Sequence, residues 1–236
     1  MATSSPLINK SLRRYVVPVL KSAGFEKVDQ RNAWSWHPDC IWVFNIRAVG
    51  NYFSEGTGWP PSSVSVMLGV FYTFIPFPTE RLALKLDALG RALPAEHLCH
   101  MRSYLPRAFP QEDRTYRLSR PAERARTDLW WLDCDGTNAE EVATAIGGSI
   151  LRTALPWFHR RTDLHAVLEA VERERDCFRK FALAAYLARQ VGASELHTKY
   201  VFLAEQEGRR IGRVPDRKRW FDSVDCLGLV VAADSL

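Results

Sequence analysis

The sequence predicts an α+β fold, in which an antiparallel sheet meander is covered by helices and followed by a helical C-terminal part. Apolar residues between positions 8 and 22 recur at helical spacing. Several strand-like runs then follow one another with no helix between them, which favours antiparallel pairing over parallel crossovers. The pattern of residues 163–208 is helical almost throughout.

The first predicted helix covers residues 8–22, and Gly24 is a typical residue to end it. We expect a kink at Pro18, because proline lacks an amide donor and clashes with the carbonyl of Arg14. The apolar positions on the buried face are Ile8, Leu12, Val16, Val19 and Leu20.

Three strands are predicted next. Trp34 and Trp36 alternate with small or polar residues, and residues 41–49 and 64–74 are rich in β-branched and aromatic side chains. Between the last two runs, residues 50–63 are rich in Gly, Ser and Pro and are expected to form a loop.

A further helix is expected after the third strand, capped by Thr79. Its leucines recur at spacings of four and three, at Leu82, Leu86, Leu89 and Leu93. Residues 97–105 are expected to be extended or irregular. Residues 106–127 are expected to form a polar, Arg-rich excursion broken by prolines.

A short aromatic strand is predicted at residues 128–133. Thr137 and Glu140 have the spacing of a capping box and open a helix that Pro156 is expected to stop. The later helical region is expected to break and restart near Gly192.

The chain is expected to divide into an α+β domain at 1–160, a helical extension packed on it at 161–208 and a basic tail at 209–236. It has 236 residues, 47% hydrophobic and 25% charged, which excludes collagen, coiled coil and disorder throughout. No run approaches the roughly 18 apolar residues of a membrane span, and the N-terminus lacks the hydrophobic region of a secretory signal.

Metal and disulfide patterns are not evident. His97, Cys99 and His100 lie close together, but a zinc site usually needs two close pairs of ligands. On a strand, the first two would share one face and His100 the other. We therefore expect no metal and no cofactor; the alternative is a metal site that the distant His159 or His37 completes.

The cysteines never form a C-x-x-C pair, which favours a reducing, cytoplasmic setting. They are Cys40, Cys99, Cys134, Cys177 and Cys226.

Four motifs occur in the order found in one known family. VLKSAGFEK is followed by aromatic strands, then by HLCHMR, by Trp130-Trp131 preceded by Asp128, and by ALPWF at 154–158. Together they resemble the bacterial family called domain of unknown function 4304, over about residues 9–175. The Arg-rich excursion and the C-terminal tail depart from it. The resemblance implies the architecture and a bacterial cytoplasmic setting, and it supplies no activity or catalytic residue.

One string has a catalytic pattern, WWLDCDGT at 130–137. An apolar strand that ends in Asp-x-Asp-Gly-Thr is typical of haloacid-dehalogenase-type phosphohydrolases, with Asp133 as nucleophile, Asp135 as acid and Mg²⁺ offsetting the charge. That fold needs parallel strands after the motif, whereas helical residues follow here. We therefore favour a turn in which Asp135 and Thr137 cap the next helix, and no catalytic residue is assigned.

Eight tryptophans are many for this length, and most fall in predicted strands or loops. Most are expected to fill the core. An exposed tryptophan near an arginine is a good anchor for a partner protein, and the same residues are able to stack on bases. The candidate binding residues are Trp36, Trp42, Arg47, Trp59, His100, Arg102, Trp130 and Trp131.

The formal charge is +5, and the basic residues cluster near the C-terminus. The cluster consists of Arg209, Arg210, Arg213, Arg217, Lys218 and Arg219. A solvated tail is favoured, and nucleic-acid binding through it is the alternative. We expect a non-enzymatic module, of an immunity or defence type, that binds another protein and no membrane. A Mg²⁺-dependent phosphohydrolase using Asp133 and Asp135 is the enzymatic alternative.

Overall fold

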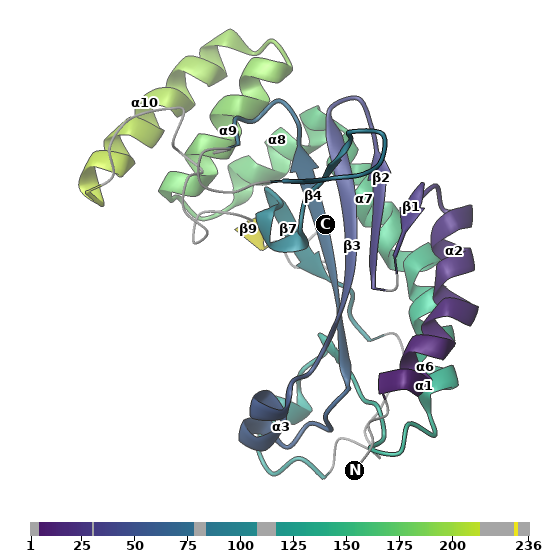
Figure 1. Cartoon of the computed structure of the whole chain (residues 1–236). Coiled ribbons are helices and arrows are strands. Elements are labelled where there is room, and N and C mark those ends of the chain that lie inside the picture. Colours follow the sequence, from purple (N-terminus) through teal and green to yellow (C-terminus); the bar gives the residue numbers. More distant parts are fainter. Residues whose placement is uncertain (1–4, 30, 78–83, 108–116, 213–228, 231–236) are drawn as a thin grey trace.

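The α+β prediction is confirmed in a computed structural model, which describes residues 5–29, 31–77, 84–107, 117–212 and 229–230. A mostly antiparallel sheet lies against helices, and more helices follow at the C-terminal end (Figure 1). None of the helices in these ranges is long and apolar enough to cross a membrane.

The main sheet has the strand order β1-β2-β3-β4-β7-β9, and β8 also pairs with β4. All pairs are antiparallel except β7 with β9. The meander β2-β3-β4 is therefore confirmed. The strands are β1 (Lys27–Val28), β2 (Asn32–Trp36), β3 (Cys40–Ala48), β4 (Val64–Tyr72), β7 (Met101–Tyr104), β8 (Leu129–Trp130) and β9 (Leu229–Val230).

Helices cover one face of the sheet. Figure 1 shows α1, α2 and α6 along one side of the long pair β3–β4. The main hydrophobic core lies between these helices and alternate residues of the strands, such as Trp42, Phe44 and Leu68. The elements on this side are α1 (Ser5–Ser11), the π-helical segment η1 (Leu12–Val16), α2 (Val17–Ser22), α6 (Ala139–Ser149), the π-helical segment η3 (Ile150–Ala154) and α7 (Leu155–Thr162).

Pro18 and Pro156 each follow a π-helical turn. The amide of Val17 bonds to the carbonyl of Leu12, and the amide of Leu155 bonds to the carbonyl of Ile150, each five residues back. The wider turn lets the next helix start with proline in its first turn, where no amide donor is needed. The predicted stop at Pro156 is therefore wrong, because the helix continues through it.

The first π-helical segment, η1, packs closely against α6. A Cβ atom at Gly147 would come within 3.0 Å of the carbonyl oxygen of Tyr15. Glycine in α6 thus permits close packing of the two helices. The Tyr15 hydroxyl also donates a hydrogen bond to Glu140.

The predicted helix at 79–93 is wrong for its described part. Residues 84–93 instead contain a hairpin of β5 (Lys85–Leu86) and β6 (Ala92–Leu93), while Thr79 and Leu82 lie outside the described residues. Gly90 has φ +75°, and the Asp87 carboxylate accepts hydrogen bonds from the amides of Leu89 and Arg91. This Asp-x-x-Gly turn outweighs the leucine spacing.

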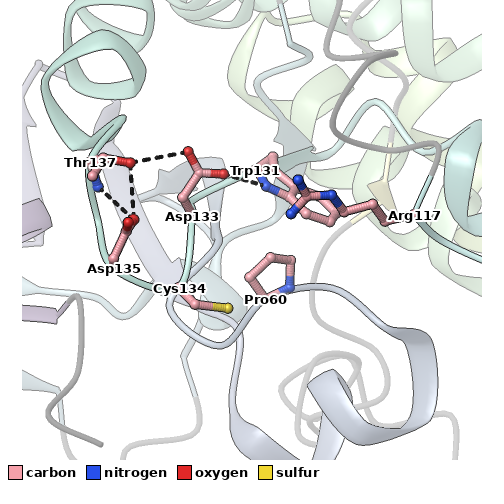
Figure 2. A pocket seen from close by; sticks show the side chains of 7 residues that line it. All are labelled: Pro60, Arg117, Trp131, Asp133, Cys134, Asp135 and Thr137. Atoms are coloured by element: carbon pink, nitrogen blue, oxygen red, sulfur yellow. Dashed lines mark hydrogen bonds between the residues drawn. The ribbon is translucent and has the colours of Figure 1, made fainter.

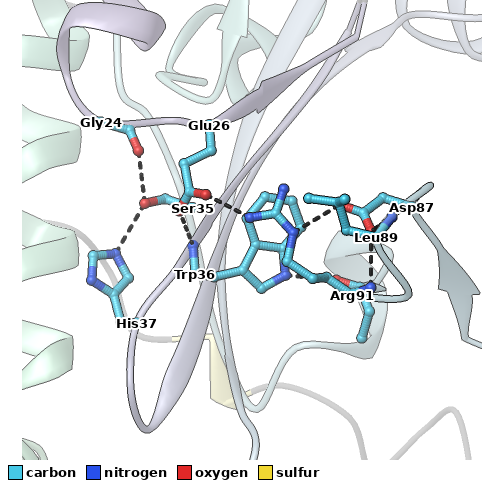
Figure 3. A network of polar contacts seen from close by, with 9 residues as sticks. Gly24, Glu26, Ser35, Trp36, His37, Asp87, Leu89 and Arg91 are labelled. Carbon is cyan, nitrogen blue, oxygen red and sulfur yellow. Dashed lines mark hydrogen bonds and ion pairs between the residues drawn. The ribbon is translucent and has the colours of Figure 1, made fainter.

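The hairpin is held on the second face of the sheet through two tryptophans. Trp34 Nε1 donates to the carbonyl of Pro94, and Trp36 Nε1 donates to that of Ala92. The Arg91 guanidinium lies 3.6 Å from the centre of the Trp36 ring and pairs with Glu26 and Asp87 (Figure 3).

The C-terminal helices are α8 (Leu164–Arg173), α9 (Phe178–Gln190) and α10 (Ser194–Arg210). The break after α9 is where the sequence indicated it, at Gly192 with φ +76°. α7 runs through residue 160, and the main core is continuous from the sheet into α8 and α9. Most of the basic tail lies outside the described residues.

Three short helical segments complete the described part of the fold. They are α3 (Asn51–Thr57), the 3₁₀ turn η2 (Glu96–Leu98) and α5 (Pro121–Arg124). α3 lies within the segment expected to be a loop, so that expectation is wrong for seven residues. Near α3 a small second core forms from Trp59, Leu118, Leu129 and Trp131.

Candidate binding surface

One part of the sheet is not covered by any described helix or hairpin. We define the open sheet face as Asn45, Arg47, Ser65, Met67, Arg102 and Tyr104. The register places Asn45 beside Met67 and Met67 beside Tyr104, so these side chains share a face. All six residues are half-buried or exposed, and Asn45 donates a hydrogen bond to Asn32.

The same strands bury their other side chains completely. Phe44, Ile46 and Leu68 alternate with the open-face residues and are at most 3% exposed. Further along the second face, the segment 84–99 covers the apolar residues Trp34, Ile41, Val43 and Phe71. The open sheet face is therefore the remainder of that face, between this cover and α3.

A buried carboxylate organises the open sheet face. Glu96 on the 3₁₀ turn η2 is 2% exposed and pairs with two arginines. Arg47 Nη2 lies 2.8 Å from Glu96 Oε2, and Arg102 Nε lies 2.7 Å from Oε1. Arg102 Nη2 also donates to Oε2 at 3.3 Å, and Arg47 Nε donates to Asn45. Two guanidinium groups thus share one carboxylate and are held in fixed orientations.

A hollow of about 270 Å³ continues the open sheet face toward α3. Its apolar lining comes from Val49, Phe53 and Leu129, and its rim carries Arg47 and Arg126. Unlike Arg47, Arg126 faces two carboxylates. Arg126 makes two hydrogen bonds to Asp128 and lies 3.7 Å from Glu123.

Tyr52 on α3 is the most exposed large hydrophobic residue of the described chain, at 92%. Its neighbour Phe53 is half-buried and lies 5.1 Å from the Arg126 guanidinium. α3 therefore carries one exposed aromatic ring, on Tyr52, and one ring that lines the hollow, on Phe53.

A second hollow, of about 440 Å³, lies around the Asp-x-Asp motif. Figure 2 shows Asp133, Asp135 and Thr137 on one side and Arg117 across from them. Trp131 Nε1 donates to Asp133 at 2.9 Å, and the Thr137 amide and hydroxyl both donate to Asp135. These hydrogen bonds lower the pKa of Asp135.

The second hollow has the local geometry of a turn. The predicted cap of α6 by Asp135 and Thr137 is wrong, because the N-cap residue is Asn138 and no side chain caps the helix. Within the turn, the Asp135 carboxylate accepts from the Thr137 amide, and the Asn138 side chain accepts from the Asp133 amide. β8 is antiparallel to β4, and α6 follows the motif, so the strand before the motif has no parallel neighbour among the described strands. A haloacid-dehalogenase-type site requires such neighbours.

Most of the predicted binding aromatics are in the interior. Trp42 and Trp130 belong to the main core, and Trp59 and Trp131 to the small second core, each at most 3% exposed. Trp42 stacks on Phe158 at 5.0 Å. As placed, these four rings stabilise the fold and do not offer anchors to a partner.

His100 is also buried, at 1% exposed, and its Nδ1 accepts a hydrogen bond from the Tyr72 amide. Burial, reinforced by the positive charge of Arg179, lowers its pKa to about 3. Trp36 is half-buried under Arg91. Of the predicted residues, the structure brings together Arg47 and Arg102 on the open sheet face.

His97, Cys99 and His100, the neighbouring residues considered as metal ligands, lie in different surroundings. Cys99 packs with the second-face cluster, His97 is exposed, and His100 is buried beside Tyr72. Among the described residues, no group of three or more His, Cys, Asp and Glu side chains is arranged to hold a metal ion.

Several residues of this surface were not identified from the sequence. They are Glu96, Tyr52, Phe53, Met67, Tyr104 and Arg126. Met67 alternates with buried neighbours in a predicted strand, and Tyr104 does so in a segment that was expected to be extended or irregular. No sequence pattern indicated Glu96, because its partners Arg47 and Arg102 lie on two separate strands, β3 and β7.

Comparison with known proteins gives no match: no family model, no curated protein and no solved structure is significantly similar to this chain. The resemblance to domain of unknown function 4304 therefore stays a prediction.

Proposed function

We propose that this chain is a non-enzymatic binding module, of an immunity or defence type, that holds another protein against the open sheet face. The observation that carries the proposal is the contrast between the two sides of β3 and β4. Alternate residues are fully buried on one side, while on the other Arg47, Met67 and Tyr104 stay accessible next to a hollow.

The residue types of this surface support a protein partner. Arginine, tyrosine and methionine are enriched at protein interfaces, and arginine and tyrosine are frequent hot spots. Arg47 and Arg102 are already oriented by Glu96, so little side-chain freedom is lost on binding. The resemblance to a bacterial family supports a bacterial, cytoplasmic setting for this partner.

A capture experiment with matched variants tests the proposal. The tagged chain is incubated with bacterial lysate, and bound proteins are identified by mass spectrometry. Tyr52→Asp and Tyr104→Asp should each reduce capture of a defined partner by about tenfold or more, because each places an unpaired charge in the interface. Phe202→Asp serves as control, since Phe202 is 60% exposed on the distant α10.

Thermal unfolding of each variant separates loss of binding from loss of fold. A partner that is captured equally by the wild type and both tyrosine variants would contradict the use of this face. Failure to capture any defined protein from several bacterial lysates would contradict the binding function itself.

The enzymatic alternative rests on the second hollow. Asp133 and Asp135 line it together, and Arg117 lies across from them. A phosphohydrolase of this kind would release phosphate from small phosphate esters only with Mg²⁺, and Asp133→Asn would abolish the release. Activity that survives in Asp133→Asn would remove the proposal.

Nucleic-acid binding is the weaker alternative. Arg209 and Arg210 end α10, but Arg210 is paired with Glu207, and the other four basic residues lie outside the described chain. Binding of this kind would weaken steeply with salt and would disappear when residues 213–236 are deleted.

A further inference from the structure

We propose that the partner presents a peptide segment with one carboxylate next to an apolar side chain. The carboxylate pairs with Arg47, and the apolar side chain enters the hollow lined by Val49, Phe53 and Leu129. This inference rests on the proposed binding function and adds the chemistry of the contact.

Charge balance points to a single carboxylate. Glu96 is the one acid in its group and faces both Arg47 and Arg102, so one positive charge is left over. The other arginine at the hollow, Arg126, faces two acids, Asp128 and Glu123. The positive charge that lacks a matching acid is therefore on the Glu96 side of the hollow, at Arg47 and Arg102.

Exposure points to Arg47 as the contact. Its side chain is 47% exposed, compared with 19% for Arg102. Arg47 uses Nε for Asn45 and Nη2 for Glu96, and its Nη1 makes no hydrogen bond to the described residues. A guanidinium with a fixed plane and a free, accessible N–H is suited to donate a hydrogen bond to an additional carboxylate.

The hollow is the proposed site for the apolar side chain of the peptide. Its volume is about 270 Å³ and its floor is largely hydrocarbon. Arg47 forms part of its rim, so a carboxylate on Arg47 places the adjoining residue of a peptide over the opening. Tyr52 precedes the lining residue Phe53 on α3, and its ring is exposed.

The same charges disfavour a nucleic acid. A phosphate backbone brings closely spaced negative charges, and Asp128 and Glu123 lie on the Arg126 side of the hollow. Closely spaced phosphates near Arg47 would be repelled by these carboxylates more strongly than a peptide that carries a single acid.

Fluorescence anisotropy with defined probes tests the inference on the full chain. The probe is a short fluorescein-labelled Gly/Ser peptide with Glu-Phe at its centre, and the matched peptide carries Gln-Phe. The wild type should bind the Glu-Phe peptide saturably and more tightly than the Gln-Phe peptide. Arg47→Gln should weaken binding of the Glu-Phe peptide by about three- to tenfold, as expected for a partly exposed charged hydrogen bond.

Arg189→Gln is the control, because Arg189 is an exposed arginine near the end of α9. Arg47→Gln leaves Glu96 paired with Arg102, so the fold is expected to persist, and thermal unfolding checks this. Equal binding of the two peptides, or an equal loss in the two arginine variants, would overturn the inference. A single-stranded oligonucleotide that binds more tightly than the Glu-Phe peptide and depends on Arg47 would also overturn it.

The outcomes separate this inference from the binding function. A lysate partner whose capture requires Tyr104, together with no binding of the Glu-Phe peptide, rejects only the carboxylate contact. Binding of the Glu-Phe peptide through Arg47 without any captured protein supports the contact and counts against a protein partner in the lysates used.

Discussion

Gly69 lies directly against Cys99. A Cβ atom at position 69 would come within 2.6 Å of the Cys99 sulfur and within 2.9 Å of its Cβ atom. The missing side chain lets the turn that carries Glu96 approach β4 closely. The position of Glu96 between Arg47 and Arg102 therefore depends on a glycine in the neighbouring strand.

Gly69→Ala should lower the free energy of unfolding by about 1–3 kcal/mol, because Cys99 is fully buried and has no room to move. Urea unfolding measures the change. Gly56→Ala is the control, since a Cβ atom there meets nothing within 4 Å and alanine favours helix α3. Equal stability of Gly69→Ala and wild type would contradict the close approach.

Glu96→Gln should lower the free energy of unfolding by about 1–3 kcal/mol. Removal of the carboxylate leaves Arg47 and Arg102 next to each other without their shared partner, and Arg102 is mostly buried. The control Glu169→Gln removes an exposed pair with Arg173 and should cost less than about 0.5 kcal/mol. A smaller effect at Glu96 than at Glu169 would show that the buried group is not stabilising.

Acid should destabilise the protein through His100. Its pKa is about 3 in the folded chain and about 6.5 when unfolded, so below pH 6.5 the unfolded chain binds more protons. The stability is intact above pH 6.5 and falls with decreasing pH, by up to about 1.4 kcal/mol per unit, until about pH 3. Burial also lowers the pKa of His37, which adds loss of the same sign.

Urea unfolding between pH 7.5 and 4.5 measures this dependence. His100→Asn should show a shallower slope, since asparagine keeps an acceptor for the Tyr72 amide and takes up no proton. His165→Gln changes an exposed residue and should leave the slope as it is. An unchanged slope in His100→Asn would assign the acid sensitivity to other groups.

Arg161→Met should raise the free energy of unfolding by about 1 kcal/mol. Arg161 is 1% exposed, and its Nε and Nη2 atoms have no hydrogen-bond partner in the described part of the chain. Burial accordingly lowers its pKa. An apolar side chain of similar length removes this cost and keeps the packing on Trp157. Arg160→Met, at an exposed neighbour, should change little; a loss of stability in Arg161→Met would indicate that its charge has a partner.

Much of the sheet was predictable from the sequence. The alternation at Trp34 and Trp36, and the β-branched and aromatic composition of residues 41–49 and 64–74, identified the three central strands, which are largely buried. Regular burial over many residues leaves a pattern that no single side chain obscures.

The hairpin and the open sheet face were not predictable in the same way. Leu86 and Leu89 have helical spacing but are 62% and 77% exposed, so no core stabilises the helix that their spacing suggests. The local hydrogen bonds of Asp87 decide the conformation instead. Likewise, Arg47, Glu96 and Arg102 come from three separate segments, and only their meeting in space gives them a joint role.

The two π-helical turns ahead of Pro18 and Pro156 also explain the sequence spacing of the buried residues around them. Buried apolar residues recur at intervals of four in both regions, at Ile8, Leu12, Val16 and Leu20 and at Val142, Ile146, Ile150, Ala154 and Phe158. In an uninterrupted α-helix, steps of four rotate the stripe by about 40° each time, so it would soon leave the core. A turn with extra residues rotates it back. Without the wide turn, the twelve steps from Ile8 to Leu20 would rotate Leu20 about 120° away from Ile8. Deletion of one residue within 12–16 would turn the π-helical turn into an α-helical one and leave eleven steps, which keep Leu20 within about 20° of Ile8.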